Sequence, residues 1–321
     1  MKTMKSLKTV LLAGFACLAL SGNAMAQSVT VYTAGPGGLI EKLAAGFKDE
    51  TGIDVNVFQA TTGKVMARLE AESANPVADV VISASWKTAT SFAKKDMLLD
   101  YTSANAKTVP DFLKGPGYVA QGISALAIAW NPKSGTPKPA DWSDLTKAEY
   151  KDLITMPDPA QSGSAYELVA ALTAQPDLGW KLFEGLAANK MIVPGANAQA
   201  LNPVLQGAKA VVFGAVDYIG LSQAAKGESI EVIFPKSGTV IAPRPMMILK
   251  TSSHQDEAKK FIDYVLSDAG QAMVAKTQLM PARSDVKADR PLIADLKILE
   301  VDPKTDRKAV LDRFAKTFGM E

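Results

Sequence analysis

The chain has 321 residues, with 35 lysines and arginines against 33 aspartates and glutamates, which gives a formal net charge of +2. This near balance provides no overall field that would favour nucleic acid or a membrane surface, so we expect neither as a partner. The single cysteine, Cys17, excludes a disulfide framework and a cysteine-ligated metal site.

Residues 1–26 have the pattern of a secretory signal peptide. Three lysines fall within the first eight residues, the apolar run Val10–Leu20 follows, and Ala24–Ala26 ends on the small residues that a signal peptidase cuts. Phe15 fits a lipoprotein cleavage site at Cys17 poorly, so we favour simple export over a lipid anchor. Removing the three lysines leaves 32 basic against 33 acidic residues, and we expect a soluble periplasmic protein that starts near Gln27.

The first part of the mature chain alternates short β-branched runs with amphipathic helices. This alternation predicts a parallel sheet covered by helices on both faces. The predicted strands are Val29–Thr33, Ile53–Phe58 and Asp79–Ser83, and the predicted helices run from Leu39 to the break at Thr51-Gly52, over Lys64–Ser73 and over Lys87–Lys95.

A second α/β series follows a linker-like stretch that begins at Asn131-Pro132. Because Pro203 lacks an N–H, we expect it to kink or interrupt the short helix that contains it. The predicted strands are Leu153–Met156, Ala210–Phe213 and Ile230–Ile233, and the predicted helices are Ser164–Ala174, Leu178–Ala188, Ala198–Gln206, Gln255–Leu266, Asp268–Ala275 and Lys308–Phe318.

Two long β segments, Tyr118–Trp130 and Ile230–Leu249, interrupt this alternation. The economical interpretation is that the chain leaves a first lobe, builds a second and returns, so that two crossing strands form a hinge over a cleft. One continuous large sheet is the alternative. We therefore predict an α/β protein with lobe 1 at residues 27–124 and 240–285, and lobe 2 at residues 125–239 and 286–321.

Several short segments, in this order and spacing, resemble the periplasmic solute-binding proteins of ABC importers, in the group that contains ferric-ion, sugar-phosphate and phosphonate binders. The segments are Val31-Tyr32, 47–53, Pro76–Val80, Leu249–Ser253, Glu257–Phe261 and Met280–Arg283. The resemblance covers residues 28–283. It implies the two-lobed periplasmic-binding-protein-like fold of type II and the delivery of a solute to an inner-membrane ABC permease.

The ferric members of that group bind iron through His, Glu and two adjacent Tyr residues, which suit a hard trivalent cation. Laid against that pattern, the His position falls on Pro36, the Glu position on Ala84 and the tyrosine pair on Asp217-Tyr218. The only histidine, His254, sits in the polar opening of a helix and is expected to be solvated there. We therefore predict no metal site and no cofactor, and keep a ferric-ion binder as the alternative function.

What remains at the ends of the predicted strands suits an anion. Helix N-termini carry unpaired N–H groups and a partial positive charge, and ligands of open parallel sheets sit where these termini point. Three such openings are Gly35–Gly38, Thr61-Thr62-Gly63 and Ser162-Gly163-Ser164. Ser, Thr and Gly are also the ordinary residues of helix caps, so each opening can equally be structural.

Individual side chains complete the candidate site. Arg244, between two prolines, is placed to clamp a phosphate, and it can equally be a surface arginine. Asp217 and Tyr218 follow a strand, where Asp217 is expected to accept hydrogen bonds from sugar hydroxyls or to pair with an ammonium group. For Trp86 we favour packing over stacking on a sugar. The candidate ligand-binding residues are Gly37, Gly38, Thr61, Thr62, Gly63, Ser83, Ser85, Ser162, Gly163, Ser164, Asn197, Asp217, Tyr218 and Arg244.

A secreted hydrolase is the rival class. The sequence contains no Gly-x-Ser-x-Gly elbow and no His-Glu-x-x-His motif, so nucleophilic triads and zinc sites lack their parts. An adhesin is disfavoured because no repeats occur. The sequence thus predicts a monomeric periplasmic binding protein, not an enzyme, that captures a sugar phosphate or phosphonate.

Overall fold

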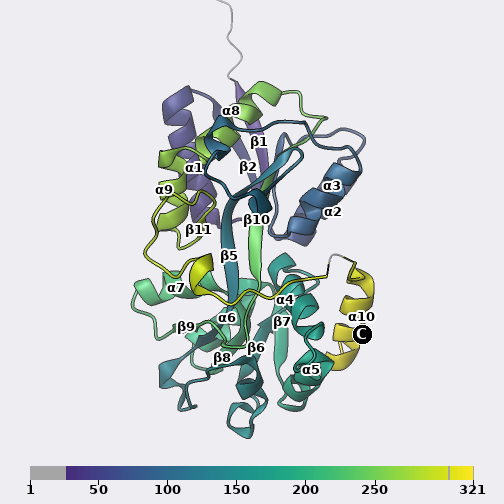
Figure 1. Cartoon of the computed structure of the whole chain (residues 1–321), viewed down its shortest axis with the longest axis vertical. Helices are drawn as coiled ribbons and strands as arrows, with labels where there is room; N and C mark the ends of the chain where they lie inside the picture. The colour runs from purple at the N-terminus through teal and green to yellow at the C-terminus, as the bar shows by residue number, and fades with distance from the viewer. Residues whose placement is uncertain (1–26, 303, 321) are drawn as a thin grey trace, which may run out of the picture.

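The computed structural model describes residues 27–302 and 304–320, and the predicted signal peptide lies outside these residues. The chain folds into two halves, one above the other in Figure 1, and the long strands β5 (Tyr118–Trp130) and β10 (Ile241–Ile248) run between them. In the described part of the chain, no helix is both long and apolar enough to cross a membrane.

The upper half is built on a mixed sheet in the order β2-β1-β3-β10-β5. The strands β1, β2 and β3 are parallel to one another, and β10 runs antiparallel to β3. Helices α1, α8 and α9 cover one face of the sheet, and α2 and α3 cover the other (Figure 1). The bounds are β1 Ser28–Thr33, α1 Gly37–Thr51, β2 Asp54–Gln59, α2 Thr62–Ala71, β3 Val80–Ile82, α3 Trp86–Lys94, β4 Lys114–Gly115, α8 Gln255–Val265, α9 Asp268–Lys276 and β11 Met280–Pro281.

The lower half continues the hydrogen-bonded path as β5-β8-β6-β7, with β9 beside β5. Helices α4, α5 and α10 pack on one face, and α6 and α7 lie on the other. The bounds are β6 Ile154–Pro157, α4 Gly163–Thr173, α5 Gly179–Ala188, β7 Ile192–Gly195, α6 Asn197–Leu205, β8 Val211–Val216, α7 Asp217–Ala225, β9 Glu231–Ile233 and α10 Arg307–Phe318. Short 3₁₀ turns occupy Ala104–Ala106, Asp111–Leu113, Pro132–Ser134, Trp142–Thr146, Ala148–Tyr150 and Ile293–Asp295.

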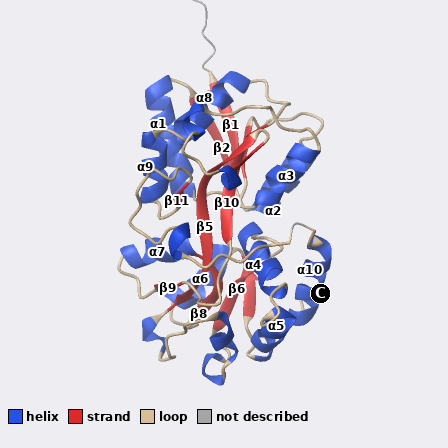
Figure 2. Cartoon of the chain, in the orientation of Figure 1, coloured by secondary structure: helices blue, strands red, loops and turns tan. Residues whose placement is uncertain are grey.

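The strand β5 belongs to both halves. Its residues up to Ala125 pair with β10, and from Leu126 onward they pair with β8, so the path of strands is continuous (Figure 2). The buried apolar side chains nevertheless separate into different cores, one around Phe47 and Phe261 above and one around Phe183 and Phe213 below. Two cores joined by shared strands confirm the predicted two-lobed α/β architecture over the alternative of one uniform sheet.

The register of β10 shifts between Pro243 and Pro245. Neither proline has an N–H for the ladder, so the irregularity falls at Arg244, which the two prolines flank. This irregularity fixes the position from which the Arg244 side chain leaves the sheet.

The position of Pro203 and two unpredicted elements, α7 and β7, differ from the sequence predictions. Pro203 does not interrupt α6, because it lies in the last turn, where its missing N–H and its ring disturb only one helical bond. Asp217 and Tyr218 open helix α7, which the sequence analysis did not predict, and β7 was not predicted either. Both are short elements with no strong apolar period of their own.

The segment before α10 makes a third passage between the halves. Leu292, Ile293 and Leu296 pack against the upper core, whereas Leu299 and Val301 pack against the lower one. The division of residues 27–321 between the lobes stays a prediction. If the lobes are separated by packing, these contacts move the start of the last lower segment from residue 286 to about residue 297.

Candidate functional site

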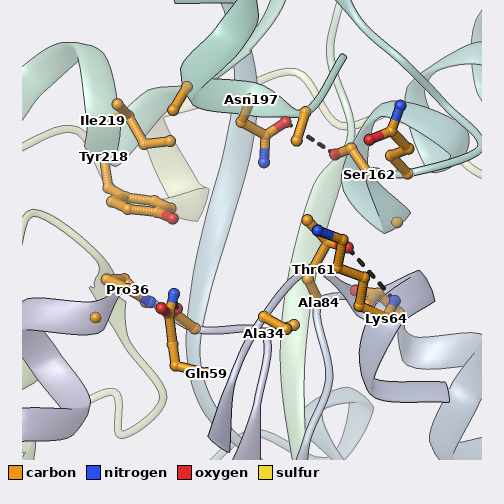
Figure 3. Close-up of a pocket in the computed structure, with 18 residues that line it drawn as sticks. Ala34, Pro36, Gln59, Thr61, Lys64, Ala84, Ser162, Asn197, Tyr218 and Ile219 are labelled. Carbon is orange, nitrogen blue, oxygen red and sulfur yellow. Dashed lines mark hydrogen bonds between the residues drawn. The ribbon is translucent and has the colours of Figure 1, made fainter. Parts of the chain in front are cut away.

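A cavity of about 450 Å³ lies between the two halves, and residues from both line it (Figure 3). The upper half contributes the loop after β1 and the openings of α1 and α2. The lower half contributes the openings of α4, α6 and α7. The described lining is Ala34, Gly35, Pro36, Gly37, Gln59, Ala60, Thr61, Thr62, Lys64, Ala84, Gln161, Ser162, Gly163, Ala196, Asn197, Ala198, Tyr218 and Ile219.

Five helices begin at this cavity. The lining contains the first residues or N-caps of α1, α2, α4 and α6, and the second residue of α7. The first N–H groups of a helix have no intrahelical acceptor and carry a partial positive charge. Thr61 and Ser162 cap the third N–H of α2 and α4, whereas no side chain caps α1. The wall therefore presents several backbone donors to one space.

The lobes approach closely at Gly163. A Cβ built there would lie 3.1 Å from Ser85 Cβ and 3.3 Å from both Ala84 O and Thr62 Oγ1, all of which belong to the upper half. Thr62 Oγ1 is itself buried without a hydrogen-bond partner. A Cβ at position 163 would therefore be in tight contact with the upper half, and the two halves or these neighbouring groups would have to move apart by a few tenths of an ångström.

Two cations, Lys64 and Arg244, lie at or directly behind the lining of the cavity. Lys64, in the first turn of α2, is the only charged side chain among the described lining residues. Behind the lining, Arg244 is 1% exposed and donates from Nη1 to Ala34 O at 2.9 Å. Its Nε is buried without a partner, and within residues 27–302 and 304–320 no carboxylate pairs with it. The buried guanidinium of Arg244 therefore contacts a lining residue, Ala34, and has no carboxylate as a counter-charge among the described residues.

Tyr218 connects Arg244 to the cavity. Tyr218 lines the cavity, and the Arg244 guanidinium carbon lies over its ring, 5.2 Å from the ring centroid. Figure 3 shows the phenol oxygen pointing into the cavity. Burial raises the pKa of Tyr218, and the Arg244 charge opposes that rise, so the phenol stays protonated and able to donate at neutral pH.

The expectation that Asp217 contacts the ligand is wrong. Its carboxylate is fully buried, forms an ion pair with Arg290, and accepts from Ala125 N at 2.8 Å and from Tyr218 N at 2.7 Å. Burial raises the pKa of Asp217, and the Arg290 charge and the two N–H donors oppose that rise. Both of its oxygens accept hydrogen bonds from within the protein, where the carboxylate fixes the start of α7 against β5.

Three predicted serines are also used internally. Ser83 Oγ donates to Thr88 Oγ1 at 2.9 Å, and Ser85 Oγ donates across the lobes to Glu167 Oε1 at 3.0 Å. Ser164 is fully buried beside Ser162 Oγ. Because none of the three lines the cavity, their predicted contact with a ligand does not fit this structure.

Half of the predicted residues do line the cavity: Gly37, Thr61, Thr62, Ser162, Gly163, Asn197 and Tyr218. Gly38, Gly63 and Arg244 lie outside the lining, with Arg244 directly behind it. Their contact with a ligand stays a prediction. Trp86 packs edge-on against Tyr118 at 5.1 Å between ring centroids, as the packing interpretation expected.

The sequence analysis missed Gln59, Lys64, Gln161 and Ile219, which also line the cavity. Lys64 had a usable signal, because it directly follows Thr61-Thr62-Gly63 in the first turn of the same helix. Gln59 is the last residue of β2, and Gln161 directly precedes Ser162, the N-cap of α4. Both therefore lie where a strand ends or a helix begins, at the cavity. Long polar side chains at such positions carry no distinctive pattern, so only the fold identifies them.

The positions laid against the ferric pattern do meet in space, since Pro36, Ala84 and Tyr218 all line the cavity. Of these, only Tyr218 offers an oxygen ligand. Across the described residues, no group of three His, Cys, Asp or Glu side chains is arranged to hold a metal ion. His254 precedes α8 and lies 3.2 Å from Asp79 Oδ1, away from the cavity.

Residues 75–302 match the family model of bacterial extracellular solute-binding proteins, so the chain belongs to that family. Members of the family capture solutes outside the cytoplasm and deliver them to a permease. Two lobes with a cavity between them are what this role requires.

Sequence relatives carry names for different ligands. A Salmonella typhimurium protein named as a 2-aminoethylphosphonate-binding periplasmic protein is 26% identical over 249 residues, which cover 75% of this chain and 73% of that protein. Iron uptake protein A1 of Synechocystis is 25% identical over 276 residues, which cover 78% and 74%.

Solved structures share the fold at lower identity. The periplasmic binding protein AfuA of Actinobacillus pleuropneumoniae, with fructose-6-phosphate bound, superposes with a TM-score of 0.81 at 23% identity, covering 92% of this chain and 99% of that one. A ferric binding protein from Campylobacter jejuni gives a TM-score of 0.73 at 24% identity, covering 91% and 98%. At such identity these matches establish the fold alone.

Proposed function

We propose that the protein is the periplasmic substrate-binding component of an ABC importer, and that it captures a small organic phosphate or phosphonate. It would act as a monomer, present the bound solute to an inner-membrane permease and leave the solute chemically unchanged. The predicted signal peptide supports the periplasmic location. The names of the relatives support a phosphorylated or phosphonate ligand and leave ferric ion as the alternative.

The observation that carries the proposal is the buried, unpaired guanidinium of Arg244 behind a cavity with no described carboxylate in its lining. Burial of an uncompensated charge costs several kcal/mol, because the ion loses its hydration. An anion in the cavity would offset part of this cost, together with Lys64 and the helix N-termini. An anionic ligand would therefore account for a buried guanidinium that has no counter-charge within the described protein.

Ligand contacts from both halves would couple binding to closure. The upper half supplies Lys64 and Thr61, and the lower half supplies Ser162 and Asn197. A ligand that touches both sets binds the closed form more tightly than the open form, and the closed population rises accordingly. The closed form is the one that a permease can distinguish from the empty protein.

Calorimetric titration of ligand-free, metal-free protein tests the proposal. We expect saturable binding of glucose 6-phosphate or 2-hydroxyethylphosphonate at a stoichiometry of about one, with the ligand recovered unchanged, as for a single cavity of this size. Ferric citrate should give no Tyr218-dependent phenolate-to-iron absorption band. Such a band, combined with no binding of any phosphate ester or phosphonate, would establish the ferric alternative instead.

A further inference from the structure

We infer that the organic part of the ligand is neutral and hydroxylated, and that the cavity selects against a ligand carrying an ammonium group. This inference rests on the proposed function and deepens it. It separates sugar phosphates and polyol phosphates from aminoalkylphosphonates, although both have the same anionic head. The inference depends on the hydrogen bonds and ion pairs that the neighbouring carboxylates and the lining amides make within the protein.

Three carboxylates adjoin lining residues, and each has partners within the protein. Asp217 is paired with Arg290. Asp158 accepts from Ala160 N at 2.8 Å and from Gln161 Nε2 at 2.7 Å, and Glu167 accepts from Ser85 Oγ at 3.0 Å. None of the three belongs to the lining, so an ammonium group in the cavity would contact no carboxylate directly.

The lining amides are oriented by their own hydrogen bonds. Asn197 Oδ1 accepts from Ser162 Oγ at 2.9 Å, which leaves Nδ2 as a donor facing the cavity (Figure 3). Gln59 Nε2 donates to Gly35 O at 3.2 Å and Gln161 Nε2 is engaged by Asp158, which leaves two neutral amide oxygens as acceptors. Neutral acceptors together with a donor match hydroxyl groups, each of which donates one hydrogen bond and accepts others.

The same arrangement disfavours an ammonium group. Transfer of a cation from water into a closed cavity is costly unless a counter-charge is present, and neutral carbonyl oxygens compensate for the lost hydration only in part. Lys64 and Arg244 add repulsion of like charge. A polar site rejects a ligand most strongly when binding of that ligand would leave buried polar groups without hydrogen bonds or charges without a counter-charge.

Matched ligand pairs test this selectivity directly. The first pair is 2-hydroxyethylphosphonate and 2-aminoethylphosphonate, and the second is glucose 6-phosphate and glucosamine 6-phosphate, each titrated calorimetrically at pH 7. We expect the hydroxyl member of whichever pair binds to bind at least about tenfold more tightly. An amino member that binds equally or more tightly overturns the inference and leaves the proposed function standing. If none of the four binds, both the proposed function and this inference fail.

A single substitution provides the second arm. Asn197→Asp keeps the acceptor for Ser162 and adds a carboxylate to the lining, so the ratio of affinities should shift toward the amino ligand by at least about tenfold. Asn202→Asp, on an exposed position of the same helix, is the matched control and should leave the ratio unchanged. Circular dichroism checks that both variants fold. An unchanged ratio in Asn197→Asp would show that this wall does not select the ligand.

Discussion

Arg244 and Arg290 both have buried guanidinium groups, yet the surroundings of these two groups differ. Arg290 is neutralised by Asp217 and also donates to Gln278 O, so its charge is part of the fold. Arg244 has a carbonyl oxygen and the face of Tyr218, and no carboxylate among the described residues. Under the proposed function, one buried charge serves stability and the other serves an anion that enters from outside.

The largest expected effect is the loss of stability in Arg290→Met. Removing one partner of a buried pair leaves Asp217 uncompensated, which typically costs about 3–5 kcal/mol in the free energy of unfolding. Urea unfolding of the ligand-free protein measures this cost. The double variant with Asp217→Asn should recover at least half of it, and an equally unstable double variant would contradict the role of the ion pair.

Arg244→Met should affect binding rather than folding. At a separation of about 8 Å and an effective dielectric constant of about 20, a charge contributes about 2 kcal/mol to holding an anion, so affinity should fall roughly 30-fold. The stability of the ligand-free protein should change little or rise, since the loss of one hydrogen bond, worth about 1 kcal/mol, is offset by removal of a buried charge that has no counter-charge. Calorimetry and urea unfolding on the same preparation separate the two effects. A stability loss like that of Arg290→Met, with unchanged affinity, would reverse our comparison.

Lys64→Ala should weaken anion binding less than Arg244→Met does. Lys64 lines the cavity but is exposed, so solvent and salt screen its charge, and we expect about a two- to fivefold loss of affinity that shrinks as ionic strength rises. Lys94→Ala, an exposed lysine in α3 outside the lining, is the matched control. Equal losses in the two variants would indicate a general charge effect instead of a local contact.

The smallest expected effect concerns Glu167. Its surroundings can be compared with those of Asp217, as those of Arg244 were compared with those of Arg290. Asp217 has a guanidinium partner, whereas Glu167 has the Ser85 hydroxyl, with Arg307 and Lys87 as the cations that act on it. Burial raises the pKa of Glu167 above its usual 4.5, so the folded protein prefers the protonated form. Its contribution to stability is therefore fully present below pH 4.5 and is lost as the pH rises through the raised value.

Glu167→Gln keeps an acceptor for Ser85 and cannot ionise. We expect its melting temperature at pH 7 to exceed that of the unaltered protein by about a few degrees. The difference should shrink as the pH falls through the raised pKa of Glu167 and vanish well below pH 4.5, where Glu167 is protonated in the folded and the unfolded chain. Thermal unfolding at several pH values measures this. A variant that is less stable at pH 7 would show that the charged form of Glu167 is the favoured one.

The sequence alone determined the two-lobed α/β fold and the openings of most helices. Alternating periods of apolar residues, and Ser, Thr and Gly at the starts of helices, are local signals that persist into the structure, so Thr61, Thr62, Ser162 and Gly163 were correctly predicted to face the cleft. These signals depend on a few neighbouring residues, which is why they can be read along the chain.

Only the tertiary structure decided which polar side chains remain available to a ligand. Asp217 follows a strand and has the chemistry for a ligand contact, yet Arg290, 73 residues later, uses its carboxylate. Arg244 lies between two prolines and packs against Ala34 O and the ring of Tyr218. Among the described residues no carboxylate pairs with it, so its charge has no counter-charge within the protein. Desolvation makes every buried polar group find whatever partner the fold brings near, and that partner is set by packing across the hinge rather than by neighbours in sequence.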